Sequence, residues 1–168
     1  MAMAELTPQE RLQPSLLDRL TDDEPDKRLE SRDRRVLSMR RLREYVLRDL
    51  AWLLNTGNME QFEDLGAHPE VRRSVLNYGA PDLLGGYFSS IDLPRVQRAL
   101  QRAIIDFEPR LLAKSVSVRA VADDSKWNRN SVTFEIEAML WSQPIPQRLF
   151  LRTDIDLETG HTTVAELT

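Results

Sequence analysis

The stretch IDFEPRL, Ile105 to Leu111, is where the periodicity of the chain changes. Before it, apolar residues recur every three or four positions, which is typical of an amphipathic helix. After it, they alternate with polar residues, which is typical of a strand that buries one face. This order predicts an α+β domain, with N-terminal helices packed on one face of a three- to four-stranded antiparallel meander.

The tripeptide EPR forms the corner between the last helix and the first strand. Pro109 disfavours the helical conformation at Glu108, so the helix should end near Phe107. Side chains two residues apart in an extended chain point the same way, so Glu108 and Arg110 should project together. We expect the proline to stiffen the corner and aim the two charges outward. Two interpretations stay open: an exposed local salt bridge, worth about 0–1 kcal/mol, or a partner contact that truncation would weaken by about 2–5 kcal/mol.

A long helix is expected from about Asp33 to Asn55, with a stop at Gly57. Apolar residues recur there at spacings of three and four, so they should form one buried stripe. The stripe consists of Val36, Met39, Leu42, Val46, Leu50 and Leu53, widened by Tyr45 and Trp52. The arginines of this helix lie mostly off the stripe. A solvated face is favoured for them over a surface for an acidic partner.

Two shorter helices are expected between the long helix and the corner. The first lies within His68 to Gly79, where Pro69 suits the first turn and Gly79 the stop. Its inward residues should be Val71, Val75 and Tyr78. The second begins after a capping Asp92, with Pro94 in its first turn. Its buried stripe should consist of Leu93, Val96, Leu100, Ala103, Ile104 and Phe107.

Beyond the corner, apolar residues alternate with polar ones in three segments, which predicts three strands. The alternating apolar residues are Val116, Val118, Ala120 and Ala122, then Val132, Phe134, Ile136, Ala138 and Leu140, then Leu149, Leu151, Ile155 and Leu157. A last short strand is expected near Val164. Such a meander has free edges, and the unpaired backbone groups of an edge can template another chain.

Residues 1–30 are expected to form a flexible N-terminal docking segment, and residues 31–168 a single domain. Prolines interrupt the first segment, and the acidic run TDDEPD, Thr21 to Asp26, separates it from the long helix. Leu16, Leu17 and Leu20 should lie on one side of a short amphipathic turn. Such a patch cannot bury itself alone, so it either packs back on the domain or docks onto a partner protein.

Composition excludes several classes of protein. The 168 residues are 41% hydrophobic and 30% charged, which describes a globular protein with a highly charged surface. We find no long apolar run and no signal sequence, so we expect a cytoplasmic protein without membrane insertion. A net charge of −4 argues against a nucleic-acid binder. Arginine supplies 20 of the 23 basic residues, which fits either protein interfaces or a GC-rich genome.

Catalytic motifs are missing, so we expect no enzyme, no cofactor and no metal site. The patterns GxxxxGK[ST], GxGxxG, HExxH and GxSxG do not occur, and cysteine is absent. The enzymatic alternative is a peptidoglycan-cleaving muramidase, with Glu108 as general acid and Asp106 or Glu135 as second carboxylate. Such an enzyme needs both carboxylates in one cleft, whereas Glu135 and Glu137 should lie on the polar face of a strand.

Four stretches taken together resemble one family. They are SLLDRL (Ser15 to Leu20), ESRDRRVLSMRRLREYVLRDLAWLLNT (Glu30 to Thr56), VRRSVLNYGAPDLLG (Val71 to Gly85) and IDFEPRL (Ile105 to Leu111). The chain resembles the TssE subunit of bacterial type VI secretion baseplates, a family related to the wedge protein of contractile phage baseplates once called lysozyme-like. The resemblance runs from about Ser15 to Leu157, and the spaced set is far more specific than EPR alone.

The resemblance implies a structural protein of the baseplate wedge at the cytoplasmic face of the inner membrane. It implies contacts with TssF, TssG, TssK and the spike protein, and a role in seeding the sheath of TssB and TssC by strand addition to a sheet edge. The family's Glu-Pro-Arg signature matches Glu108, Pro109 and Arg110, which implies assembly contacts there. A cytosolic regulator that binds another protein through the same fold is a third interpretation.

Overall fold

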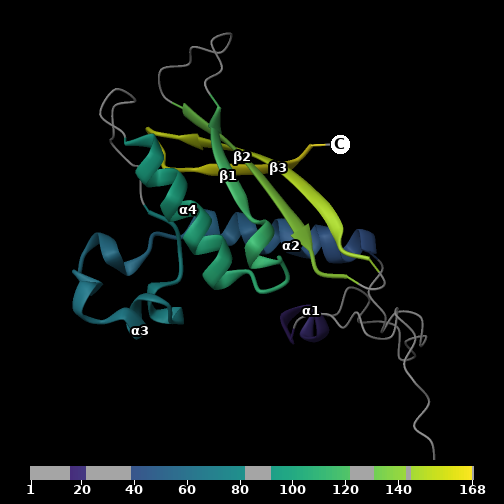
Figure 1. Cartoon of the computed structure of the whole chain (residues 1–168), viewed down its shortest axis with the longest axis horizontal. Helices are drawn as coiled ribbons and strands as arrows, with labels where there is room; N and C mark the ends of the chain where they lie inside the picture. The colour runs from purple at the N-terminus through teal and green to yellow at the C-terminus, as the bar shows by residue number, and fades with distance from the viewer. Residues whose placement is uncertain (1–15, 22–38, 82–91, 122–130, 143–144, 168) are drawn as a thin grey trace, which may run out of the picture.

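Two long helices cover one face of a four-stranded sheet in the computed structural model of the chain (Figure 1). The model describes residues 16–21, 39–81, 92–121, 131–142 and 145–167. Its helices are α1 (Leu16–Leu20), α2 (Met39–Leu54), α3 (Pro69–Arg72) and α4 (Leu93–Phe107). Its strands are β1 (Ser117–Val121), β2 (Ser131–Leu140), β3 (Gln147–Asp156) and β4 (Thr162–Glu166).

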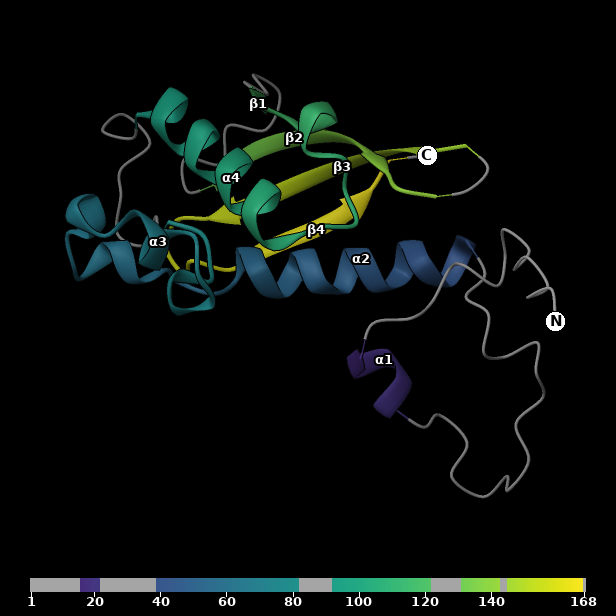
Figure 2. The same cartoon turned by 60° about the horizontal axis from the view of Figure 1, so that its bottom comes forward.

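The strands pair antiparallel in chain order, β1-β2-β3-β4. This arrangement confirms the predicted α+β class and the meander. Helix α4 lies against β1 and helix α2 lies beneath β4, so each edge strand has a helix beside it (Figure 2). None of the described helices is long and apolar enough to cross a membrane.

The core forms where the apolar sides of the helices meet the inner face of the sheet. Along β2 every second residue is buried, so the strand turns one side toward the helices and the other toward solvent. The fully buried side chains include Val46, Leu50, Ile104, Phe134, Ile136, Leu140, Leu149 and Leu151. The predicted stripes of α2 and α4 are therefore confirmed where the structure describes them, and Val36 and Ala122 lie outside the described residues.

Trp52 departs from the predicted stripe of α2, because half of it is exposed. The guanidinium of Arg48 lies over the Trp52 ring, with Cζ 4.9 Å from the ring centroid. The same Cζ lies 5.0 Å from the centroid of the Tyr45 ring. Trp52 thus supports a charged side chain at the surface of α2 instead of widening the core.

Helix α4 begins and ends where the sequence predicts. The Asp92 side chain accepts a hydrogen bond from Arg95 N at 3.0 Å, which caps the first turn. The helix ends at Phe107, and Glu108 leaves the helical region with φ −118° and ψ 79°. The proline at 109 therefore has the predicted effect on the residue before it.

The helix predicted within His68 to Gly79 is shorter than expected. Helix α3 covers only Pro69–Arg72, and a 3-10 helix, Val75–Asn77, follows an extended Ser74. The Ser74 side chain accepts from Leu76 N and so starts this second turn. The prediction that Val75 faces inward is wrong, because the break at Ser74 rotates it outward and leaves it 81% exposed.

Gly79 is required by its backbone and its surroundings. Its φ is +133°, and a Cβ at this position would lie 2.4 Å from the carbonyl oxygen of Thr56. The close approach lets Ala80 N donate to Thr56 O at 2.8 Å, while Asn58 N donates to Ala80 O at 3.1 Å. The NYG turn therefore joins the end of α2 to the segment that leads into α4.

Candidate functional site

The EPR corner is held together by its own charges. Arg110 donates to Glu108 three times: from its backbone N to Oε1 at 3.1 Å, from Nε to Oε1 at 2.7 Å and from Nη2 to Oε2 at 2.5 Å. The predicted pairing of these two side chains is confirmed. The expected outward direction is wrong for Glu108, which is only 3% exposed. Its carboxylate lies inside because the bidentate contact with Arg110 compensates the charge there.

Further charges from distant elements extend the corner into a network. Arg110 Nη2 also donates to Asp49 Oδ2 at 2.6 Å, and Asp49 belongs to α2. The other oxygen of Asp49 accepts from Arg48 Nε at 2.9 Å. Arg48 Nη2 in turn lies 2.7 Å from Asp18 Oδ1 of α1, an ion pair without the geometry of a directed hydrogen bond. Alternating charges thus join α1, α2 and the corner after α4, and we call these five residues the corner network.

The corner network changes the protonation equilibria of the groups around it. Burial lowers the pKa of Arg110, but hydrogen bonds and charge from Glu108 and Asp49 outweigh it and raise the pKa above its ordinary value. The pKa of Tyr78 is raised by burial first and then by the negative charges of Asp49 and Glu108. Tyr78 also packs edge-on against Phe107, with ring centroids 5.3 Å apart.

Part of the corner remains accessible. Pro109 is exposed and Arg110 is half-buried, and both line an open hollow of about 480 Å³ together with Leu17, Trp52 and Tyr78. A partner side chain can therefore reach the proline ring and the guanidinium, whereas Glu108, which also lines the hollow, is almost fully buried. The local salt bridge between helix and sheet is present, in a buried form.

Two leucines of helix α1 are exposed to solvent. Leu17 is 46% exposed and Leu20 is 74% exposed, whereas the Asp18 side chain is fully buried against Arg48. The side chain of Leu16 lies outside the described residues. Figure 2 shows α1 below α2 and apart from the sheet. A charged contact therefore holds α1 against the domain, and the apolar side of its turn stays open.

The two edges of the sheet differ in how their backbone groups are used. At the β1 edge, side-chain amides of α4 occupy outward groups: Ala120 N donates to Gln97 Oε1 at 3.4 Å, and Gln101 Nε2 donates to Val116 O at 2.8 Å. Helix α4 therefore packs beside this edge and bonds to it at two points, and no described residue bonds to the outward N–H or C=O of Val118 between them. A helix packed beside an edge strand hinders its pairing with another chain.

The β4 edge is fastened to α2 at both ends and open between them. Asn55 accepts from Thr162 N at 2.9 Å and donates to Thr162 O at 2.8 Å, and Arg43 pairs with Glu166. In the antiparallel register with β3, the backbone groups of Val164 point away from the sheet, as those of Thr162 do. No described residue bonds to the outward N–H or C=O of Val164. A hollow of about 770 Å³ opens beside Thr162 to Val164.

The carboxylates of the enzymatic alternative do not share a cleft. Glu108 is enclosed by Arg110, and Asp106 lies 3.6 Å from Arg73 at the end of α4. Glu135 and Glu137 lie on the outer side of β2, where Glu137 pairs with Arg148 at 2.7 Å. Among the described residues, no group of three His, Asp or Glu side chains is placed to hold a metal ion.

Residues 40–145 match the family described as Baseplate wedge protein gp25. The chain belongs to this family. The matched segment begins in α2, contains the NYG turn, α4 and the EPR corner, and ends after β2. No curated protein and no solved structure matches the chain.

Membership of the gp25 family makes the chain a structural baseplate wedge component of a contractile, phage-like apparatus. The catalytic interpretation loses its motivation, since the family is one of structural proteins. Sequence reasoning missed Asp18, Arg48 and Asp49 as members of the corner network. A lone carboxylate on the polar side of a helix gives no local signal of a buried partner more than fifty residues away.

Proposed function

We propose that this gp25-family wedge protein is the TssE subunit of a type VI secretion baseplate. In this role it links wedge subunits and seeds polymerisation of the sheath, at the cytoplasmic face of the inner membrane. Its neighbours would be TssF, TssG and TssK around the spike protein, and TssB and TssC would form the sheath that grows from it. The spaced motifs SLLDRL, NYG.PDL and EPR favour this member of the family over a phage wedge protein.

The β4 edge is the observation that carries sheath seeding. On the β1 edge the amides of Gln97 and Gln101 bond on either side of Val118, whereas the outward N–H and C=O of Val164 on β4 lie beside a hollow. A strand that adds there completes the backbone ladder without displacing any described contact of Val164. We therefore assign strand addition to β4.

Linking of wedge subunits is assigned to the corner and to α1. Leu17 and Leu20 supply an apolar docking patch, which the sequence prediction extends to Leu16, and Pro109 and Arg110 supply an accessible corner beside it. Glu108 acts through Arg110, because it is buried and fixes the direction of the guanidinium. Truncation of an exposed leucine of this patch should weaken wedge assembly while leaving the fold intact.

A proline scan of β4 tests the proposal. Val164→Pro removes an outward donor that β3 does not use, so the fold should persist and fluorescently labelled sheaths should fail to form in cells. Ala165→Pro is the matched control, because Ala165 pairs with Arg152 inside the ladder and its loss should lower the melting temperature. If cells carrying Val164→Pro assembled sheaths at the normal frequency, strand addition at β4 would be wrong.

A further inference from the structure

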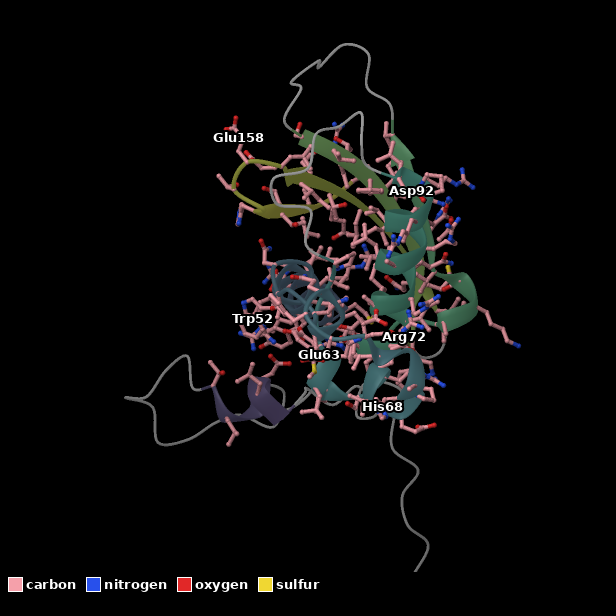
Figure 3. All side chains as sticks on the ribbon, turned by 90° about the vertical axis from the view of Figure 1, so that its left-hand side faces the viewer. Trp52, Glu63, His68, Arg72, Asp92 and Glu158 are labelled. Atoms are coloured by element: carbon pink, nitrogen blue, oxygen red, sulfur yellow. The ribbon has the colours of Figure 1, made fainter. Side chains whose placement is uncertain are left out.

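A stripe of three arginines runs along the outer side of α4. Arg95, Arg98 and Arg102 follow one another at spacings of three and four, so they lie on one face over about 10 Å of helix. All three are exposed. Figure 3 shows nitrogen-tipped side chains gathered along α4 between the labelled Asp92 and Arg72. We call these three residues the α4 arginine stripe.

The stripe lacks the acidic partners that other arginines of the described surface have. Such pairs include Arg40 with Glu44, Arg43 with Glu166, Arg72 with Glu60, Arg73 with Asp106, and Arg148 with Glu137. In the described ranges, no carboxylate lies within ion-pair distance of the three stripe residues. Three positive charges therefore stand together without compensation on a chain whose net charge is negative.

The position of the stripe is electrostatically unfavourable for α4 itself. Arg95 lies in the first turn, where the helix dipole disfavours positive charge, and the N-cap carboxylate of Asp92 accepts from the Arg95 backbone without a described ion pair to its guanidinium. Arg98 and Arg102, four residues apart, repel each other. A local arrangement that the fold alone does not favour indicates a ligand that supplies the missing charge.

The stripe also lines a hollow. A cavity of about 400 Å³ lies between α4 and the segment that carries α3, with the three arginines, Asn58, Gln61 and Asn77 in its wall. The acidic groups of that wall, Glu60 and Asp106, are engaged by Arg72 and Arg73. The hollow therefore combines guanidinium groups that lack described carboxylate partners with amide side chains. A guanidinium group can bind one carboxylate through two parallel hydrogen bonds.

We propose that the α4 arginine stripe docks an acidic segment of a partner protein, with carboxylates on one face of a helix at i, i+3 and i+7. Charge complementarity selects this occupant, because three arginines without described carboxylate partners face it at helical spacing. A short acidic helix can place one carboxylate against each guanidinium. This docking surface is separate from the β4 edge and from the corner.

Fluorescence anisotropy with purified full-length protein tests the docking surface. The probe is a labelled alanine-rich helical peptide with glutamates at i, i+3 and i+7, and the control peptide carries glutamines there. We expect the glutamate peptide to bind in a salt-sensitive way. Combining Arg95→Glu, Arg98→Glu and Arg102→Glu should raise its dissociation constant at least about tenfold. The matched control reverses the same number of charges at Arg40, Lys114 and Arg119, which are exposed and lie on other elements, and it should keep affinity.

Several results would overturn the proposal. Equal binding of the glutamine peptide, equal loss in the control variant, or tighter stripe-dependent binding of a DNA duplex would each do so. Arg98→Glu alone serves if the triple variant does not fold, and should still weaken binding. Because this assay contains no baseplate, its failure leaves sheath seeding untouched.

A second arm uses the intact assembly. A photo-crosslinking amino acid at Ala99, which lines the hollow, should join to a partner peptide rich in Asp and Glu. Sequencing a neutral or basic peptide at that crosslink would overturn the proposal.

Discussion

The EPR corner and the β4 edge both contain polar groups, but these groups differ in whether they are hydrogen-bonded within the chain. At the corner, both oxygens of Glu108 accept from Arg110, whose guanidinium also binds Asp49. At the β4 edge, the N–H and C=O of Val164 meet no described residue. The polar groups of the corner are largely bonded within the chain, whereas the edge leaves two backbone groups without a described hydrogen bond.

This difference shows that a charged motif can stabilise the fold from inside as well as form a surface for a partner. A tripeptide with two opposite charges resembles a contact site, yet burial makes Glu108 chiefly an anchor of the fold. The partner surface is better marked by donors and acceptors that the fold leaves unused. The corner still contributes Pro109 and Arg110 to a surface, with Glu108 fixing their geometry.

The largest expected effect comes from breaking the anchor. Glu108→Ala should lower the free energy of unfolding by about 3 kcal/mol, because it leaves the half-buried guanidinium of Arg110 with Asp49 alone. Urea unfolding measures the loss. Glu108→Gln keeps the acceptor oxygen and the volume, so it should cost clearly less. A loss below about 1 kcal/mol for Glu108→Ala would place the carboxylate at the surface and remove the contrast with the edge.

The next effect tests how the edge is fastened. Asn55→Ala removes the two hydrogen bonds between Asn55 and the backbone of Thr162, so stability should fall by about 2 kcal/mol. Amide hydrogen exchange at the start of β4 should speed up more than exchange in β2. Asn55→Asp keeps the acceptor for Thr162 N and loses the donor to Thr162 O. Its stability should therefore lie between that of the parent and that of Asn55→Ala. Unchanged exchange in β4 would show that Asn55 does not fasten this edge.

Much of this architecture is predictable from local sequence. Asp92, Pro94 and Pro109 mark both ends of α4, and alternation in Val132 to Leu140 marks β2 with its inner face. These signals act between neighbours, or through a period that the backbone imposes. They therefore hold before any tertiary contact is known.

The failures share one cause, which is contact between distant segments. The burial of Glu108 depends on how α2 and α4 lie together, and Val75 turns outward because Ser74 starts a new turn. The edge contacts of Gln97, Gln101 and Asn55 depend on strand register, which one sequence does not reveal. The α4 arginine stripe follows from helical spacing alone, but its lack of described acidic partners depends on tertiary contacts.

A smaller effect distinguishes the covered edge from the open one. Gln101→Leu removes the bond to Val116 O and should cost about 1 kcal/mol. Together with Gln97→Leu it should also free the β1 edge, so that the chain self-associates in sedimentation experiments. Leucine preserves bulk, so the change isolates the amide. A double variant that stays as monomeric as the parent would show that the body of α4, rather than its amides, protects β1.

The smallest effect reports the charge of the corner through Tyr78. Burial and the charges of Asp49 and Glu108 raise its pKa above the ordinary value near 10. The unfolded chain therefore ionises first, so the stability due to neutral Tyr78 is complete below about pH 10 and is lost as pH rises through the raised pKa. Phenolate absorbance, read as the difference from Tyr78→Phe, measures this ionisation. Asp49→Asn should lower the pKa only part of the way, because burial remains; no change would mean that Asp49 is not ionised beside the ring.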